Sequence, residues 1–452
     1  MKTNSTAARA LLTSAVIAGV IAVVADSAAA SPAPGHARPM TGAVYYVSPT
    51  GDDSAAGTKG APWQSLAHAQ DVAQPGDTVY VRGGTYAYTH ATTSCSSQTA
   101  RVDAVTLSKS GTSGSPIRYW AYPGERPVLD FSKMTDDCRI KGLDVTGSWL
   151  YLKGLEITGV PQNNTLNHES WGVWNSGSDN TYEQLDVHDI MGPGVFLQDG
   201  GGNLVLNTDS HDNYDADSSS GPGTNADGFG AHIPAGNPGN VFRGDRSWNN
   251  SDDGFDLINA LSSVTIEQSW AWSNGYVPGT ATSAGDGNGF KAGGYGGKYV
   301  TGGVKHTVRQ SVAFDNKAAG FYANHHTVAD DFFNDTGYGN HPDFNMLGVA
   351  PDGTATGLGT LRNDVAYTGT LTSNMTGTDS ADNSWDLGLA LSDAQFQSVS
   401  TTGWDAPRHS DGSLPTLPYL RPAATSDLID QGTDVGLPYK GEAPDLGAFE
   451  TR

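Results

Sequence analysis

Residues 250–257, NSDDGFDL, contain a short unit in which a glycine precedes a bulky apolar residue. The unit recurs along the chain, and its glycines are separated by 22, 34, 26, 35 and 31 residues. No interval carries a convincing amphipathic helical pattern, so the repeats must stack strand on strand. The repeat therefore predicts an all-β solenoid, a parallel β-helix. Its occurrences are WGV (171–173), PGV (193–195), DGF (227–229), DGF (253–255), NGF (288–290) and AGF (319–321).

The sequence also predicts where the solenoid begins and ends. Residues 61–86 combine a short amphipathic helix, which would cap the open apolar core, with a Pro-Gly-Asp turn and a strand from Thr78 to Arg82. We expect the β-helix to occupy residues 44–375. Residues 376–452 are then the C-terminal loops of the same domain, and the segment APDLGAFE (443–450) is expected to supply a closing turn and strand.

The first residues are typical of a secretory signal. Lys2 and Arg9 precede an apolar run and the small-residue stretch DSAAAS, and we place the cleavage after Ala30. No other stretch reaches the ~18 apolar residues that a membrane span requires. We therefore expect residues 1–30 to be removed and the protein to be secreted and extracellular, with no membrane attachment. Residues 31–43, rich in Pro, Gly and Ala, form a predicted linker.

The charge balance restricts the possible partners. The net charge is −23, and it becomes −24 when residues 1–30 are removed. Such a surface argues against nucleic acid, and a polyanionic substrate would bind only where a local cation reverses the field. Nothing in the sequence indicates a partner protein, so we expect a monomer.

The chain has two cysteines, Cys95 and Cys138. In an exported protein they predict one structural disulfide, which closes a loop of 43 residues. A metal site or a thiol nucleophile is the alternative, but no Cys-x-x-Cys or Cys-His spacing accompanies them.

Aligning the repeats on their phenylalanines gives the column Phe229, Phe255, Phe290 and Phe321, which predicts a ring stack in the core. Residues in one column would be ~4.8 Å apart, the spacing of adjacent strands. The alignment also places acidic side chains beside one another. Two positions before the phenylalanine the residues are Asp227, Asp253, Asn288 and Ala319, and one position after it they are Gly230, Asp256, Lys291 and Tyr322.

Four carboxylates, those of Asp227, Asp252, Asp253 and Asp256, therefore converge. Two unit charges ~4 Å apart repel by about 4 kcal/mol at an effective dielectric of ~20, so a cation is required. A site with only oxygen ligands and no His or Cys favours calcium. Two alternatives remain open: Asp-Gly is a common turn sequence, and calcium can also hold coils together without catalysis.

Lys291 is the candidate catalytic base. It is the only lysine in GNGFKAGG, and its glycine neighbours leave room for a ligand. The alternative is an ordinary ion pair with Asp256. If a uronate carboxylate lies on the calcium, the metal acidifies the proton on the neighbouring ring carbon, a base removes it, and the β-linked glycosidic oxygen leaves. Lysine must be neutral for this step, which predicts an alkaline optimum and a need for added calcium.

Three motifs in this order resemble the family 9 polysaccharide lyases, whose members include pectate lyases: NADGF (225–229), NNSDDGFD (249–256) and GNGFK (287–291). PGDTVYVRGGTY (75–86), GFYANHH (320–326) and FNML (344–347) extend the resemblance. It implies a right-handed parallel β-helix and calcium on the four aspartates. It also implies that Lys291 is the base in β-elimination of α-1,4-linked galacturonan in polygalacturonate or pectin. Cleavage pattern, preferred glycan and methylation level do not carry over.

Two other functions compete with this one. A polygalacturonase-type hydrolase also clusters aspartates on a β-helix, but its downstream Gly-His and Arg-Ile-Lys signals are missing: Arg139-Ile140-Lys141 precedes the acids, and Gly35-His36 lies in the linker. A non-catalytic, calcium-stabilised glycan-binding β-helix would explain the acids but leave Lys291 unused.

Candidate substrate contacts are weaker. Three arginines in repeat segments, Arg243, Arg246 and Arg309, could pair with further uronate carboxylates. Asn324 and His325 follow Lys291 by about one coil and are further candidates.

Overall fold

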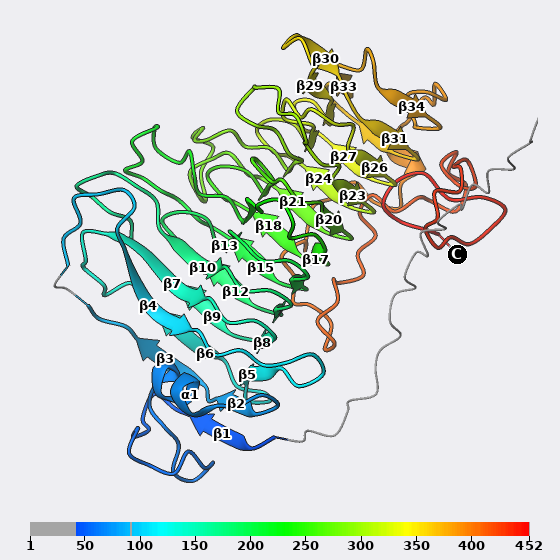
Figure 1. Cartoon of the computed structure of the whole chain (residues 1–452). Helices are drawn as coiled ribbons and strands as arrows, with labels where there is room; N and C mark the ends of the chain where they lie inside the picture. The colour runs from blue at the N-terminus through cyan, green and yellow to red at the C-terminus, as the bar shows by residue number, and fades with distance from the viewer. Residues whose placement is uncertain (1–41, 91–92, 452) are drawn as a thin grey trace, which may run out of the picture. The chain divides into compact units, whose positions relative to one another are not determined.

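The computed structural model describes residues 42–90 and 93–451, so the predicted signal and most of the predicted linker lie outside the described residues. The chain forms a parallel β-helix in which ten coils each contribute one strand to each of three sheets, and an incomplete coil at either end adds one more strand to the first sheet (Figure 1). We call them sheets 1, 2 and 3, in the order in which the chain passes through them. The all-β fold predicted from the repeat is confirmed.

Sheet 1 has twelve strands. They are β1 (Val44–Val47), β2 (Thr78–Val81), β5 (Ile117–Ala121), β8 (Leu150–Lys153), β11 (Thr181–Glu183), β14 (Leu204–Leu206), β17 (Asn240–Arg243), β20 (Val264–Glu267), β23 (Thr307–Arg309), β26 (Asp331–Phe333), β31 (Thr360–Arg362) and β34 (Asp379–Ala381).

Sheet 2 has ten strands. They are β3 (Gly84–Ala87), β6 (Pro127–Asp130), β9 (Glu156–Thr158), β12 (Asp186–His188), β15 (Asp209–His211), β18 (Arg246–Trp248), β21 (Trp270–Trp272), β24 (Val312–Phe314), β27 (Thr336–Tyr338) and β32 (Val365–Tyr367).

Sheet 3, also of ten strands, carries the candidate site. Its strands are β4 (Arg101–Leu107), β7 (Arg139–Val145), β10 (Trp171–Asn175), β13 (Val195–Leu197), β16 (Phe229–Ala231), β19 (Phe255–Asp256), β22 (Phe290–Lys291), β25 (Phe321–Tyr322), β28 (Phe344–Asn345) and β33 (Thr372–Ser373). Outside the three sheets are the hairpin β29 (Leu347–Val349) and β30 (Ala355–Gly357), the helix α1 (Leu66–Val72) and a 3-10 turn at Asp393–Gln395.

The predicted phenylalanine column is confirmed. Phe255 pairs in register with Phe229 on one side and Phe290 on the other. The rings stack in the core at centroid separations of 4.8 and 4.9 Å. Phe321 continues the stack, and Phe344 extends it by one coil more than the sequence alignment did. Since this register is set by buried rings, it also fixes the side chains that point outward from sheet 3.

Polar ladders close the turns. The backbone N–H of Asn250 donates to Asn274 Oδ1, and that of Asn274 donates to Asn316 Oδ1. The side-chain amides of Asn250 and Asn274 donate to the same oxygens. Each of these buried asparagine oxygens therefore accepts hydrogen bonds from the coil beside it.

The N-terminal cap is the predicted one. The N-cap of α1 is Ser65, whose hydroxyl accepts a hydrogen bond from the backbone of His68, and the helix buries Leu66 and Ala69 against the first coils. The disulfide between Cys95 and Cys138 is also present.

The C-terminal prediction is wrong in two respects. The β-helix does not end at residue 375, because β34 at Asp379–Ala381 pairs with β31 and continues sheet 1. Residues 443–450 contain no strand; they are bends and irregular backbone. The tail instead covers the outer face of sheet 2, where Trp404 packs against Trp270 and Phe314 at 3.9 and 4.6 Å between centroids. Leu446 joins the same cluster. Burial of scattered large side chains needs no strand pairing, and for that reason the segment has no periodic signal.

Candidate active site

Sheet 3 brings the predicted acids and the predicted base together. Asp227 and Asp253 lie just before β16 and β19, and Asp256 is the last residue of β19. Asp256 is paired in register with Lys291, the last residue of β22. The outward-facing row of sheet 3 therefore delivers a carboxylate and an amine side by side from neighbouring coils.

The ammonium of Lys291 lies among carboxylates. Its Nζ is 2.9 Å from Asp253 Oδ2 and 3.1 Å from Asp256 Oδ2. A fifth acid, Asp286, reaches it at 3.5 Å and was missed in the sequence because it belongs to the loop before β22, outside the repeat alignment. The side chain of Asp286 is 70% exposed, whereas those of the other two acids are buried.

Burial and mutual repulsion govern the charges of the acids. Burial, followed by repulsion from neighbouring acids, raises the pKa of Asp227 and Asp252 well above the usual value. Burial also raises the pKa of Asp253, against the attraction of Lys291. Burial lowers the pKa of Lys291, but the surrounding carboxylates raise it more, so its net pKa lies well above that of a free lysine. The cluster contains more negative than positive charge and favours a further cation.

The donor set fits calcium. Two groups of three carboxylates, Asp227/Asp253/Asp256 and Asp252/Asp253/Asp286, each have oxygens within 4.8 Å of one another, and Asp253 belongs to both. Asn288 holds Asp253 Oδ1 in place through its backbone N–H at 2.7 Å. The ligands offered are oxygens alone, as a hard cation requires.

Lys291 and four of the acids, Asp227, Asp252, Asp256 and Asp286, line a pocket of about 430 Å³ that continues over the preceding coils of sheet 3, and Asp253 is buried behind them. One wall is aromatic: Trp174 pairs in register with Phe196, and Phe196 with Gly230. A Cβ at Gly230 would lie only 2.6 Å from the Phe196 ring, so the glycine leaves room for this ring over the coil that precedes Asp256. The register alignment could have found this row had it been extended to WGV and PGV.

Two arginines line the same pocket and were not predicted as contacts. Arg139 is paired with Glu169. The guanidinium of Arg101 lies over the rings of Trp171 and Trp174, at 5.3 and 5.0 Å from their centroids. Among the described residues no carboxylate forms an ion pair with Arg101, which leaves it available to an anionic ligand.

The three arginines predicted from the sequence lie elsewhere. Arg243 and Arg309 end strands of sheet 1, and both bind Glu267. Arg246 is buried in sheet 2, where it binds Asp209 at 2.6 Å and carbonyls of the tail. The structure does not bring any of them to the acids, because each sits on a sheet other than sheet 3.

Asn324 and His325 follow β25, one coil beyond Lys291. The side-chain amide of Asn324 donates to the Gly293 carbonyl at 2.7 Å, and His325 Nδ1 contacts the Tyr322 hydroxyl at 3.2 Å. Neither is among the residues that line the pocket.

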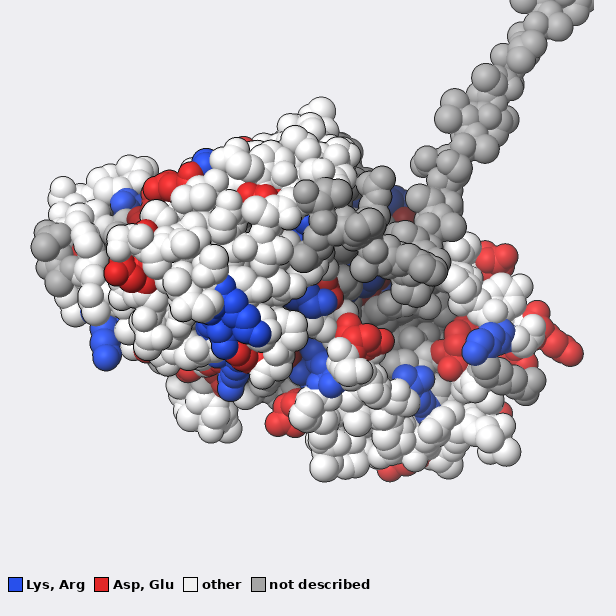
Figure 2. All heavy atoms as spheres, turned by 90° about the horizontal axis from the view of Figure 1, so that it is seen from below, with Lys and Arg blue, Asp and Glu red and all other residues white. Residues whose placement is uncertain are grey.

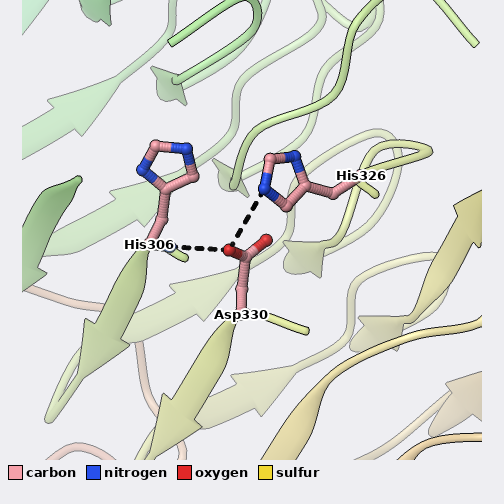
Figure 3. Close-up of side chains that lie close together, drawn as sticks. All are labelled: His306, His326 and Asp330. Carbon is pink, nitrogen blue, oxygen red and sulfur yellow. Dashed lines mark hydrogen bonds and ion pairs between the residues drawn. The ribbon is translucent and has the colours of Figure 1, made fainter. Parts of the chain in front are cut away.

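His306, His326 and Asp330 form a second cluster of metal-binding residue types (Figure 3). Both nitrogens of His326 are used by the backbone: Nδ1 accepts from Gly294 and Nε2 donates to the Val304 carbonyl. Asp330 Oδ1 accepts from the backbone of His306 at 2.7 Å. Burial lowers the pKa of His306 to about 3 and raises that of Asp330 well above its usual value. Both histidines are therefore uncharged at neutral pH, since burial also lowers the pKa of His326, and the cluster ties neighbouring coils together through its hydrogen bonds to the backbone.

On the face shown in Figure 2, acidic and basic side chains lie interspersed. The net charge of the chain is −23. No helix within residues 42–90 and 93–451 has both the length and the apolar character needed to cross a membrane.

Comparisons with known proteins agree with this geometry. The model of the Pel9A-like right-handed β-helix region matches residues 45–364. The chain is 36% identical over 413 residues to pectate lyase L of Dickeya chrysanthemi, covering 90% of each protein. It is 34% identical to the crystal structure of pectate lyase Pel9A, with a TM-score of 0.77 and coverage of 91% of this chain and 97% of that one. A rhamnogalacturonan lyase structure is 33% identical, with a TM-score of 0.78 over 85% of this chain and 97% of that chain. The chain therefore belongs to the Pel9A-like right-handed β-helix family, the family 9 polysaccharide lyases.

Proposed function

We propose that this protein is a secreted, monomeric, calcium-dependent pectate lyase that cleaves polygalacturonate by β-elimination. The observation that carries the proposal is the position of Lys291 Nζ, between 2.9 and 3.5 Å from three carboxylates at the floor of an open pocket. Asp227, Asp252, Asp253 and Asp256 would hold the calcium. When bound, calcium would neutralise the acids that keep Lys291 protonated and would withdraw charge from a uronate carboxylate, which acidifies the proton on C5.

The chain's own groups supply proton transfer and orientation. Lys291 Nζ accepts the C5 proton, the electron pair of the C–H bond forms the C4–C5 double bond, and the C4–O bond breaks. The departing oxygen takes up a proton, and no water is consumed. Register with Asp256 fixes the amine on sheet 3, and the buried ring column below it prevents the strand from shifting.

Substrate contacts in this proposal come from the preceding coils. Arg101 has no carboxylate partner among residues 42–90 and 93–451, and it lies over Trp171 and Trp174 in the same pocket as Lys291. A polymer that lies along sheet 3 would place a further uronate carboxylate there, where guanidinium binds it with two parallel hydrogen bonds.

The proposal is tested by ultraviolet absorbance of polygalacturonate and of rhamnogalacturonan, with added calcium and with a chelator. A calcium-dependent rise on polygalacturonate supports it, because elimination leaves unsaturated ends. Reducing ends without absorbance would indicate a hydrolase. A rise on rhamnogalacturonan alone would keep the elimination chemistry and replace the substrate.

A further inference from the structure

A second pocket, of about 420 Å³, lies away from sheet 3. One wall is the corner where strands of sheet 1 turn into sheet 2, and the other wall is the C-terminal tail. Within residues 42–90 and 93–451 no acidic side chain lines it, in a chain whose net charge is −23. The lining residues used below are Arg243, Gln268 and Gln310 from the corner, and Leu414, Arg421 and Phe449 from the tail.

Arg421 has no ion-pair partner among the described residues. Its Nε donates to the Leu417 carbonyl at 2.9 Å, and its guanidinium lies 4.2 Å from the centroid of the Phe449 ring. Burial lowers the pKa of Arg421, and no carboxylate offsets this effect. Its remaining N–H groups are therefore free to bind an anion.

Arg243 adds to the positive charge of this pocket. It shares the carboxylate of Glu267 with Arg309, so two guanidinium groups are neutralised by one acid. Arg421, Arg243 and Arg309 therefore place three positive charges in or beside the pocket, against the one negative charge of Glu267. A carboxylate that enters meets a net positive field and two forked donors, which is the arrangement that binds carboxylates most strongly.

The rest of the lining is typical of a sugar site. Leu414 and Phe449 supply apolar surface, and the amide of Gln268 donates to Gln310 Oε1 at 3.4 Å. The amide of Gln310 and the oxygen of Gln268 have no other partner among the described residues and can bind hydroxyl groups.

We propose that this pocket is a second carbohydrate site, which binds a uronate unit of an acidic oligosaccharide with its carboxylate on Arg421 and Arg243. The choice of a uronate as the ligand rests on the proposed function, whereas the anion site itself does not. Such a site holds a distant part of the polymer, or of a neighbouring chain, while sheet 3 carries out the cleavage.

Calorimetric titration of trigalacturonate into the full protein, in chelator so that cleavage is suppressed, tests this site. We expect Arg421→Gln to weaken binding at least tenfold. Gln268→Glu is nearly isosteric and adds a negative charge to the pocket. It should weaken trigalacturonate binding by a similar factor while the contact between Arg421 and Phe449 is kept. Arg362→Gln is the matched control, because Arg362 is paired with Asp379 on another coil. Arg101→Gln, in the catalytic pocket, should retain this binding.

The site is overturned if wild-type protein does not bind trigalacturonate in chelator, or if neutral galactotriose binds equally well. It is also overturned if Gln268→Glu binds as wild type does, since loss in Arg421→Gln alone would then reflect displacement of the tail. The proposed function fails separately, when wild-type protein with calcium produces no unsaturated ends from polygalacturonate.

Discussion

At the scale of single residues, Asp253 is the centre of the candidate site. It is fully buried, belongs to both carboxylate groups, and forms the shortest contact to Lys291. Its Oδ1 is already oriented by the amide and the backbone N–H of Asn288. One side chain therefore belongs to the proposed calcium site and also contacts the proposed base.

Asp253→Asn should weaken calcium binding by at least about tenfold, because it removes one unit of negative charge from the donor set while keeping the side-chain shape. Calorimetric titration with calcium alone measures this without reference to activity. The control is Asp352→Asn at an exposed loop position. Equal calcium affinities for wild type and Asp253→Asn would place the metal elsewhere.

Arg101→Gln should raise KM for polygalacturonate about tenfold and change kcat little, because the lost charge-assisted contact lies away from the reacting carbon. Initial rates over a range of polymer concentrations separate the two constants. Arg101→Lys should recover part of the loss. A drop in kcat at unchanged KM would contradict the assignment of Arg101 to substrate binding.

At the scale of elements, a stack runs along the outside of sheet 2. His211 lies 4.1 Å from the Trp248 ring and is held between Asp186 on β12 and Asp212 after β15. Burial lowers the pKa of His211, but the hydrogen bonds and charges of these two acids outweigh it and raise the pKa to about 9. His188 stacks on its other face.

Because the folded pKa of His211 lies above that of an unfolded histidine, this stabilisation is complete below about pH 6.5 and is lost as pH rises through about 9. We expect His211→Gln to lower the free energy of unfolding by up to about 3 kcal/mol near pH 6 and by much less near pH 10. Thermal unfolding over this pH range checks it, with exposed His409→Gln as the control. A pH-independent difference would contradict the charge argument.

The sequence predicted the residues of the repeat but not the site residues that lie outside it. The phenylalanine column and the Asp256–Lys291 pairing follow from a repeat in which every coil buries the same position, so alignment of DGF with NGF suffices. Asp286 lies in an inserted loop, whose length no periodicity constrains. Arg101 and Arg139 belong to coils that precede the first recognisable Gly-apolar unit. They line the same pocket as the acids because their side chains are long, and the repeat does not predict how far a side chain extends.

At the scale of the whole molecule, the C-terminal tail is part of the solenoid's stability. Trp404 is fully buried against the aromatic outer face of sheet 2, and the nearby tail residue Arg408 binds Asp209 and the backbone of the coils. This face would expose Trp270 and Phe314 to water if the tail were absent. Because the large tail residues are irregularly spaced, the sequence does not predict that the tail covers sheet 2.

Trp404→Ala should lower the free energy of unfolding by about 3–5 kcal/mol, as expected for a large buried aromatic side chain. Activity below the unfolding temperature should change little, because the catalytic pocket lies on sheet 3. Denaturant unfolding gives the stability change, and Tyr439→Ala, at an exposed tail position, is the control. A loss of activity without a loss of stability would contradict this division of roles.

The central claim is that Lys291 is the base of an elimination, and the initial rate of unsaturated-product formation by Lys291→Ala tests it most directly. General-base catalysis contributes about 10²- to 10⁴-fold, so the rate on polygalacturonate with calcium should fall by that factor. Lys305→Ala, at an exposed lysine paired with Asp331 on sheet 1, should keep the wild-type rate. A Lys291→Ala variant that retains full activity would contradict the claim.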